Sequence, residues 1–391
     1  MTIDIILRRN NPIEDTSSLY TGAFSPTLRF SFFGVFDGHN GSSTARRLTA
    51  DLSGVVCLHL ADIYLQCAGT SPERHPGETP YPWPASDEIH SAVKAAFTEV
   101  DDLMVHEAAK RVLGVSGEGY RALNEGKESS ESPPPSNTLP MPRFEAMNLL
   151  KEAYAGSCAI LGIYNNLERT LHVALTGDSR AVLGRRIPVP PNNFPEGERR
   201  SVKQSSASVE YAYKAHQLSL DQNAKNPKEA ERLTTLHPDE PELLEKDRVL
   251  GWGCACAFGD GVMKWTAAVQ KRLWQEFLGS RPRDVLKTPP YFTAKPEVTT
   301  FEGVRRGDFL VLALDGLWDS LTNEEVVGLV GKWLEERGSK EKICFTEKET
   351  EVIMPNKVYP RTTIRLPRKD RTDFKSGTGI QTTTYVGSLF P

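Results

Sequence analysis

Two runs of the chain are apolar almost without interruption: RFSFFGVF at residues 29–36 and DFLVLAL at residues 308–314. Runs of this length without alternating polar residues are typical of strands that are covered on both faces. Between Cys158 and Arg186, the shorter runs CAILGIY, TLHVALT and AVLGRR are separated by NNLER and GDSR. Because Asn, Gly and Asp favour turns, we predict an antiparallel meander of three strands here.

Three other segments carry apolar side chains at three- and four-residue spacing, which predicts helices. The first runs from Ser42 to about Cys67, and the second begins at Ser86 and continues to about residue 113. The third follows Leu321, with Thr322 in the N-cap position. Buried strands combined with long amphipathic helices predict a layered α+β domain.

Three segments lack this periodicity and are rich in Pro, Ser, Gly and charged residues: 68–85, 115–142 and 187–209. This composition predicts surface insertions or linkers. The chain has no internal repeat, and the runs on either side of the insertions do not form two independent cores. We therefore expect one domain with long loops.

The bulk composition excludes two classes of partner. Of the 391 residues, 39% are hydrophobic and 25% are charged, with a formal net charge of −4, which is ordinary for a globular protein. We see no Lys/Arg stripe, so we expect no nucleic-acid partner. We see no run of about 18 apolar residues, so we expect a protein that is not membrane-embedded. The first residues, MTIDIILRRNN, have the features of neither a secretory signal nor a transit peptide.

The cysteines are scattered, and one pair forms a C-x-C rather than the C-x-x-C of zinc or redox sites. They are Cys57, Cys67, Cys158, Cys254, Cys256 and Cys344. We expect reduced, structural thiols rather than metal ligands or disulfides.

Acidic residues recur beside glycine where apolar runs end. The pairs are Asp37–Gly38, Gly177–Asp178, Gly259–Asp260 and Asp315–Gly316. Each pair alone is commonly just a turn. Four such pairs after buried runs favour a different interpretation, in which strand ends bring several carboxylates to one cleft and the glycines permit close approach.

Convergent carboxylates repel one another, and a hard divalent cation relieves that repulsion. Oxygen ligands suit Mg²⁺ or Mn²⁺, whereas the chain does not place His and Cys at zinc-ligand spacing. Two such ions could activate a bridging water and hold a phosphate in line. His39 follows Asp37 by two residues, so it is either an exposed turn histidine or the proton donor to a leaving alkoxide.

Four motifs in order, FGVFDGHNG, TGDSRAVLGRR, AFGDGVMKW and LALDGLWDSLTNEEVV, resemble those of the metal-dependent type 2C protein serine/threonine phosphatases. The segments NNPIED, LSLDQNAKNPKEAERL and PPYFTAKPEVT are similar in particular to the pyruvate dehydrogenase phosphatase branch and its fungal relatives. The resemblance extends from about residue 8 to about residue 335.

This resemblance implies a central antiparallel β-sandwich flanked by helix pairs, with two Mg²⁺ or Mn²⁺ ions at one edge. Asp37 would bridge the ions, Gly38 would offer its carbonyl, and Asp315 would be a further direct ligand. The reaction implied is attack of the bridging hydroxide on a phosphoserine or phosphothreonine, with no phosphoenzyme intermediate.

The resemblance also assigns roles around that centre. Glu14 and Asp15 would hold metal-bound waters in the inner or second shell. Asp178 corresponds to a position that helps to bind a third, weaker ion. His39 would be the general acid.

The sequence departs from the family pattern in four places, one of which is Thr16, where the family commonly has Arg after the Glu-Asp pair. Asn10 stands where many members have a phosphate-binding arginine, and Ala255–Cys256 replaces a Ser/Thr-Arg pair. We also find no closing strand with its Asp-Asp or Asp-Asn, because Asp370 and Asp373 precede Lys, Ser and Gly rather than an apolar run. We therefore predict a phosphatase-like domain over residues 8–338, incomplete at its C-terminal end, and a poorly ordered tail over 339–391.

The leading functional hypothesis is a Mg/Mn-dependent phosphatase that acts on phosphoserine or phosphothreonine proteins, as a monomer. The alternative is a catalytically impaired pseudophosphatase that binds phosphoproteins or regulates a partner. A third interpretation is an incomplete or altered gene product of an active family. The branch resemblance implies a mitochondrial location; because the family motif begins within the first fifteen residues and leaves no room for a presequence, the other expectation is cytoplasmic.

Overall fold

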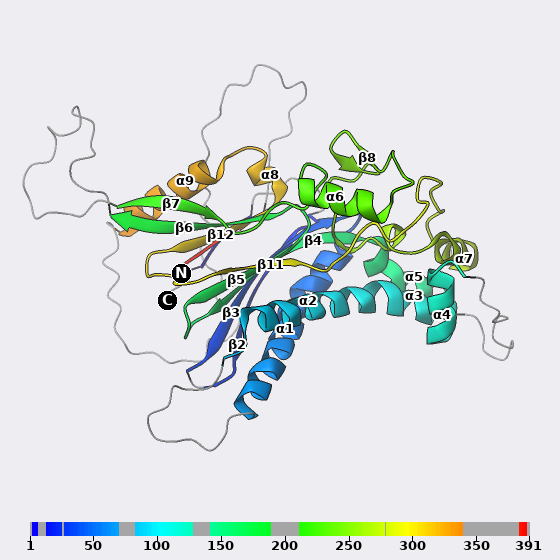
Figure 1. Cartoon of the computed structure of the whole chain (residues 1–391), viewed down its shortest axis with the longest axis horizontal. Coiled ribbons are helices and arrows are strands. Elements are labelled where there is room, and N and C mark those ends of the chain that lie inside the picture. Colours follow the sequence, from blue (N-terminus) through cyan, green and yellow to red (C-terminus); the bar gives the residue numbers. More distant parts are fainter. Residues whose placement is uncertain are drawn as a thin grey trace, which may run out of the picture.

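The structure is a computed structural model of the chain, and it describes residues 2–6, 13–25, 27–69, 83–127, 141–188, 211–277, 279–338 and 383–388. Two antiparallel sheets form a sandwich (Figure 1). The first sheet has the strand order β1 (Thr2–Ile6), β13 (Thr383–Ser388), β12 (Phe309–Ala313), β6 (Arg180–Pro188) and β7 (Tyr211–Gln217). The second has the order β11 (Glu297–Phe301), β5 (Thr170–Thr176), β4 (Gly156–Asn165), β3 (Arg29–His39) and β2 (Thr16–Ala23), and β10 (Phe258–Gly259) also pairs with β4.

Helices cover the outer faces of both sheets (Figure 1). The second sheet shares one apolar core with a layer of helices, which are α1 (Ser43–Gly69), α2 (Ser86–Asp102), a π-helical turn (Leu103–Glu107), α3 (Ala108–Leu113), α4 (Gly117–Asn124), α5 (Arg143–Tyr154) and α7 (Ala267–Phe277). On the first lie α8 (Asp315–Trp318) and α9 (Asn323–Gly338). The remaining short elements are α6 (Pro227–Leu236), the hairpin of β8 (Leu244–Glu245) and β9 (Arg248–Val249), and a 3₁₀ turn (Gly261–Met263).

The two apolar runs become β3 and β12, and their side chains explain why the sheets stack. Val35 of β3 and Leu310 of β12 are fully buried in the core between the sheets. Phe36 of β3 instead belongs to the outer core beneath α1 and α2. Each run therefore supplies apolar side chains to both faces, as its continuous pattern predicts.

The predicted helices form where expected. The segment from Ser86 to about residue 113 is helical throughout, with the π turn at its centre. Thr322 caps α9: its hydroxyl accepts a hydrogen bond from the Glu325 backbone N–H at 3.2 Å, and its own N–H donates to the Glu325 carboxylate at 2.9 Å. This reciprocal pair satisfies two N–H groups at the helix start.

The predicted three-strand meander is correct for only two strands. β4 pairs with β5, but β6 crosses to the other sheet and pairs with β12 and β7. The turn GDSR therefore connects the two sheets. The segment 115–142, predicted to be an insertion loop, contains helix α4. Most of the predicted insertions at 68–85 and 187–209 lie outside the described residues.

A closing strand is present, contrary to the prediction, but its sequence TTYVGS lacks the Asp-Asp or Asp-Asn that the resemblance implies. β13 pairs with β12, where Ala313 lies opposite Thr384, and with β1, where Ile6 lies opposite Thr383. Both β1 and β13 lie outside the predicted boundaries of 8–338. The sequence TTYVGS of β13 lacks the continuous apolar pattern of β12, which is why it is predicted to belong to a poorly ordered tail.

Within the described residues, α1 is the one helix long and apolar enough to cross a membrane by length and composition. Its fully buried residues Leu48, Leu52, Val56 and Leu60 belong to the core over the second sheet. This packing is that of a core helix in a layered domain.

Candidate metal centre and catalytic site

A cavity of about 600 Å³ opens at one end of the sandwich. It brings together every site residue that the sequence predicts: Glu14, Asp15, Asp37, Gly38, His39, Asp178 and Asp315. These residues come from four separate segments of the chain. Arg248, Trp252 and Arg283 also line the cavity.

Asp37 lies near the end of β3, which is paired on both sides by β2 and β4. Asp37 itself pairs with Cys158 of β4, and the preceding Phe36 also pairs with Thr16 of β2, so the backbone that carries the carboxylate is fixed. The next residue must be small, because a Cβ atom on Gly38 would overlap the backbone carbonyl of Glu14. Gly38 therefore lets the Glu14–Asp15 segment lie directly against the end of β3.

The Glu14 side chain is held by the turn that follows β3. Its Oε1 atom accepts a hydrogen bond from the Gly41 backbone N–H at 3.0 Å. That turn uses left-handed backbone conformations at Asn40 (φ 57°) and Gly41 (φ 115°), which Asn and Gly tolerate best. The sequence Asp-Gly-His-Asn-Gly thus ends the strand and aims its polar groups into the cavity.

Asp178 and Asp315 approach from the other sheet. Asp178 lies in the turn between β5 and β6, where its Oδ1 accepts a hydrogen bond from the Cys158 thiol at 3.2 Å. The turn is fixed by Gly177, whose N–H donates to the Gln222 side chain at 2.8 Å. Asp315 is the first residue of α8, directly after β12. The sandwich therefore places these carboxylates opposite Asp37.

The crowding of carboxylates changes their acidity. Burial, followed by the charges of Asp315, Asp15 and Asp178, raises the pKa of Asp37 well above its usual range. Burial and the charge of Asp315 raise the pKa of Asp178 to about 6. Both shifts therefore arise first from burial and then from the negative charge of neighbouring carboxylates.

Carboxylates together with the Gly38 carbonyl are the donors that Mg²⁺ and Mn²⁺ prefer, so the residues present fit a hard divalent cation. The described side chains do not form a complete ligand set by themselves: no group of three or more His, Cys, Asp or Glu among them is so arranged that it could hold a metal ion. Waters would therefore have to supply part of the coordination.

His39 makes a contact that the sequence does not predict. Its Nε2 lies 2.6 Å from Oδ2 of Asp260, a fully buried carboxylate. Burial alone lowers the pKa of His39, but Asp260, with smaller contributions from Asp178 and Glu14, raises it overall. The His39 ring also packs edge-on against Trp252, with centroids 5.7 Å apart.

An arginine from another element contacts Ala255–Cys256, the pair at which the sequence departs from the family pattern. Arg232 of α6 donates hydrogen bonds to the Ala255 carbonyl at 3.0 Å and to the Cys256 sulfur at 3.5 Å, and it pairs with Glu229 at 2.8 Å. The sequence does not predict this contact, because it joins two separate elements.

Sequence reasoning missed Asp260, Arg248 and Arg283 as site residues. Asp260 had a signal, since it is the acid of the third acid–glycine pair, but nothing in the sequence connects it to His39. The two arginines lie in segments without regular periodicity. Asn10, Asp370 and Asp373 lie outside the described residues, and the strand sequence of β13 contains no acidic residue.

Comparison with known proteins connects this geometry to a family. The sequence pattern described as Protein phosphatase 2C matches residues 136–350. A protein phosphatase 2C homolog of Schizosaccharomyces pombe is 33% identical over 330 residues, which are 83% of this chain and 61% of the relative. The mitochondrial pyruvate dehydrogenase (acetyl-transferring) phosphatase 1 of Saccharomyces cerevisiae is 30% identical over 311 residues, 78% of this chain and 44% of the relative.

The human mitochondrial pyruvate dehydrogenase (acetyl-transferring) phosphatase 1 is 29% identical over 356 residues, 84% of this chain and 60% of the relative. The chain thus spans between 44% and 61% of the length of these relatives. The pattern match covers more than half of the chain, and the relatives extend the similarity to most of it. The chain belongs to the protein phosphatase 2C family.

Proposed function

We propose that this protein is a Mg²⁺- or Mn²⁺-dependent phosphatase of phosphoserine and phosphothreonine proteins. The observation that carries the proposal is the convergence of the seven predicted residues on one cavity. Family membership supports a protein phosphatase, and the cavity supplies the oxygen donors that such chemistry requires.

Asp37, the Gly38 carbonyl and Asp315 would hold two ions, with Glu14 and Asp15 orienting their waters. Asp178 would help to bind a third, weaker ion. When bound, the ions would supply an activated water and neutralise charge on the phosphate. The raised pKa of Asp37 supports this assignment, because a nearby cation would favour the ionised carboxylate that burial and neighbouring acids disfavour.

The protein's own groups would orient the substrate and the leaving group. Arg248 and Arg283 line the cavity and would pair with the phosphate oxygens, in place of the arginine that the sequence lacks at Asn10. His39 would give its proton to the leaving alkoxide of serine or threonine. Trp252, packed against both His39 and Phe292, would limit the movement of water around that histidine.

The test is phosphate release from a phosphothreonine peptide by the purified chain. We expect release in the presence of Mn²⁺ and its loss after chelation, with recovery on adding Mn²⁺ back. A chain that folds and binds Mn²⁺ but releases no phosphate would refute the proposed activity.

One observation favours the pseudophosphatase alternative: the sequence of the closing strand β13 carries no carboxylate. Calorimetric titration with Mn²⁺ separates the two functions. Two bound ions at millimolar affinity or tighter support the phosphatase. A chain that binds a phosphopeptide but neither binds ions nor releases phosphate is the pseudophosphatase.

The relatives suggest a substrate and a location for the proposed activity. Two of them are named as mitochondrial phosphatases of pyruvate dehydrogenase. We infer that this chain acts on a phosphorylated pyruvate dehydrogenase-type protein in mitochondria. Faster dephosphorylation of that protein than of an unrelated phosphoprotein, together with mitochondrial location of the tagged protein, would support the inference. Equal rates and a cytoplasmic signal would contradict it.

A further inference from the structure

The contact between His39 and Asp260 is possible because Gly156, which has no side chain, leaves room for it. Gly156 of β4 lies opposite His39 of β3 and opposite Gly259 of β10. A Cβ atom on Gly156 would overlap both the His39 Nε2 atom and the Asp260 carboxylate. The three strands are therefore arranged so that the imidazole and the carboxylate meet directly over Gly156.

The backbone of Asp260 is held in an unfavourable conformation. Its φ of 46° and ψ of 47° lie in the left-handed region, which is sterically unfavourable for a residue that carries a Cβ atom. The Asp260 N–H donates to the Ala155 carbonyl at 2.9 Å, and the Asp260 carbonyl accepts from the Met263 N–H at 2.8 Å. A strained backbone conformation of this kind persists only where several surrounding contacts hold it in place.

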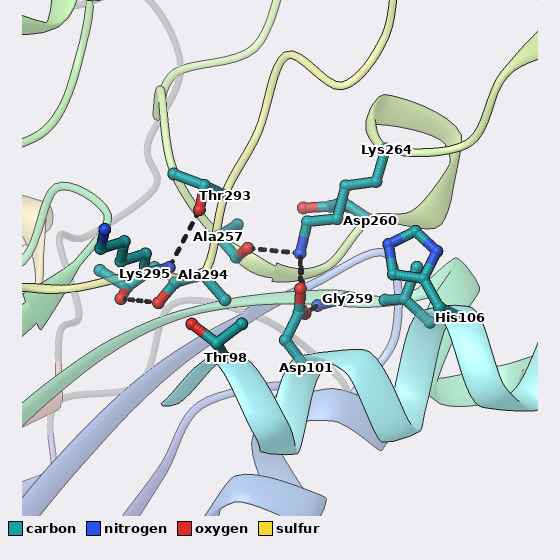
Figure 2. A network of polar contacts seen from close by, with 12 residues as sticks. Thr98, Asp101, His106, Ala257, Gly259, Asp260, Lys264, Thr293, Ala294 and Lys295 are labelled. Atoms are coloured by element: carbon teal, nitrogen blue, oxygen red, sulfur yellow. Dashed lines mark hydrogen bonds and ion pairs between the residues drawn. The ribbon is translucent and has the colours of Figure 1, made fainter. Parts of the chain in front are cut away.

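A buried ion pair provides such contacts on both sides of Asp260 (Figure 2). Lys264 reaches both carboxylate oxygens of Asp101, at 2.6 and 2.7 Å, and also the Ala257 carbonyl at 2.8 Å. Asp101 of α2 in turn accepts a hydrogen bond from the Gly259 N–H at 2.8 Å. Helix α2 thereby clamps the loop that presents Asp260.

The Asp260 carboxylate has one hydrogen-bonding partner within the described part of the chain. Its Oδ2 contacts His39, while its Oδ1 is buried without a hydrogen bond there. Buried carboxylates usually satisfy both oxygens. Among the described residues, His39 is therefore the one side chain that forms a hydrogen bond with this carboxylate.

We propose that Asp260 is the positioning residue for His39, holding its Nε2–H so that the Nδ1 edge faces the substrate. This inference rests on the proposed phosphatase function. A carboxylate only accepts, so the ring nitrogen that contacts it carries hydrogen. As water attacks phosphorus and the bond from phosphorus to the leaving oxygen breaks, the Nδ1 proton passes to that oxygen. The ring carries both protons as an imidazolium before this step and is neutral after it, with its Nε2–H still on Asp260.

Leaving-group dependence tests this role. A serine or threonine alkoxide needs a proton to depart, whereas p-nitrophenolate leaves readily without one. With Mn²⁺, we expect Asp260→Asn to lower kcat for a phosphothreonine peptide about tenfold or more, within the range of general acid catalysis. Its kcat for p-nitrophenyl phosphate should change by less than about threefold on the same grounds.

His39→Asn should show the same selective loss, and the double variant should be no worse than His39→Asn alone, because the two residues act as one unit. The matched control is Asp308→Asn, which breaks another buried ion pair, between Asp308 and Arg185 at 2.9 Å. Its ratio of the two kcat values should equal that of the unaltered protein. An equal loss on both substrates in Asp260→Asn, or no loss on either, would overturn the proposal.

A second readout needs neither metal nor substrate. Proton NMR of the chain labelled with ¹⁵N-histidine should show a low-field Nε2–H resonance that His39→Asn and Asp260→Asn remove and Asp308→Asn retains. Absence of any such resonance assignable to His39 would overturn the proposal, even if Asp260→Asn fails to fold. If the low-field resonance of His39 is present but neither substrate is hydrolysed, the proposed phosphatase function is refuted, while the contact between His39 and Asp260 is still supported.

Discussion

Gly38 shows how one residue type decides the geometry of the candidate centre. A Cβ atom there would overlap the Glu14 carbonyl, so any other residue would push apart the two segments that carry the proposed ligands. Gly156 does the same for His39 and Asp260. At the residue scale, these glycines are required by close approach of the backbone and not by turns.

The first prediction concerns Gly38→Ala. Because the Glu14–Asp15 segment must move, we expect Mn²⁺ affinity to fall by about tenfold or more, as for changes that misplace groups around a metal. Calorimetry would measure it. Gly54→Ala is the matched control, since no atom lies within 4 Å of a Cβ at that position in α1. Unchanged affinity in Gly38→Ala would contradict the assignment of Glu14 and Asp15.

His172 provides a prediction about pH and stability. This residue of β5 is 2% exposed, and burial, with the neighbouring His90, lowers its pKa to about 4. Its Nδ1 lies 2.9 Å from the Thr300 hydroxyl, which also contacts His90 at 2.7 Å. In the unfolded chain the pKa is about 6.5, so the unfolded state binds the proton first. Stability is complete above that value and is lost as pH falls toward about 4.

We expect the free energy of unfolding to fall by up to about 3 kcal/mol more in the unaltered protein than in His172→Asn between about pH 7 and about pH 4. Guanidinium unfolding at several pH values would measure the difference. Parallel pH profiles for the two proteins would show that His172 is not the group responsible.

At the scale of elements, the β8–β9 hairpin places the positively charged side chain of Arg248 at the cavity. Arg248 begins β9, and its Nη1 donates a hydrogen bond to the Gly251 carbonyl at 3.2 Å. A Cβ on Gly253 would lie 3.8 Å from that Nη1 and 3.9 Å from the Asp178 carboxylate. The hairpin therefore brings a positive charge close to the proposed ligands.

We predict that Arg248→Ala raises KM for a phosphothreonine peptide by about tenfold, since a hydrogen bond to a charged group contributes roughly 1.5 kcal/mol or more. Initial rates would be measured against peptide concentration. Lys246→Ala is the control, because this exposed side chain lies in the same hairpin and does not line the cavity. Equal KM values for both variants would exclude Arg248 from phosphate binding.

The strand β13 is a second element with a specific consequence. It separates β1 from β12, and Val386 lies opposite Ile3 on one side and Val311 on the other. Proline cannot donate a ladder hydrogen bond in a central strand. We predict that Val386→Pro lowers the free energy of unfolding by about 1–3 kcal/mol.

Val386→Thr keeps the N–H and the branched shape, so it serves as the matched control for the backbone effect. Chemical unfolding of the two variants would be compared. If both lose the same stability, the backbone pairing of β13 contributes nothing, and the prediction of a domain that is incomplete at its C-terminal end would stand.

At the scale of the whole molecule, the long periodic helices and strands could be predicted from the sequence. The way in which the strands pair with one another could not. The continuous run that forms β3 and the capped helix after Thr322 follow from local pattern and hydrogen-bonding chemistry. The crossing of β6 to the other sheet and the pairing of β13 depend on contacts between distant segments, for which TTYVGS gives no local signal.

Part of the candidate site could likewise be predicted from the sequence, and part of it could not. Asp37, Asp178 and Asp315 were accessible to sequence reasoning because each ends or follows a strand beside a glycine. The partnership of His39 with Asp260 was not accessible, since it depends on three strands meeting at Gly156. The contact of Arg232 with Ala255 and Cys256 was likewise not predictable, because it joins separate elements.

The central claim is that the carboxylate cavity carries out metal-dependent dephosphorylation. The most direct measurement is phosphate release from a phosphothreonine peptide as a function of Mn²⁺ concentration, for the unaltered chain, Asp37→Asn and the control Asp308→Asn. We predict saturable activation by Mn²⁺ in the unaltered chain and in Asp308→Asn, and loss of about 10²-fold or more in Asp37→Asn. Release that is independent of Mn²⁺, or unaffected by Asp37→Asn, would contradict the claim.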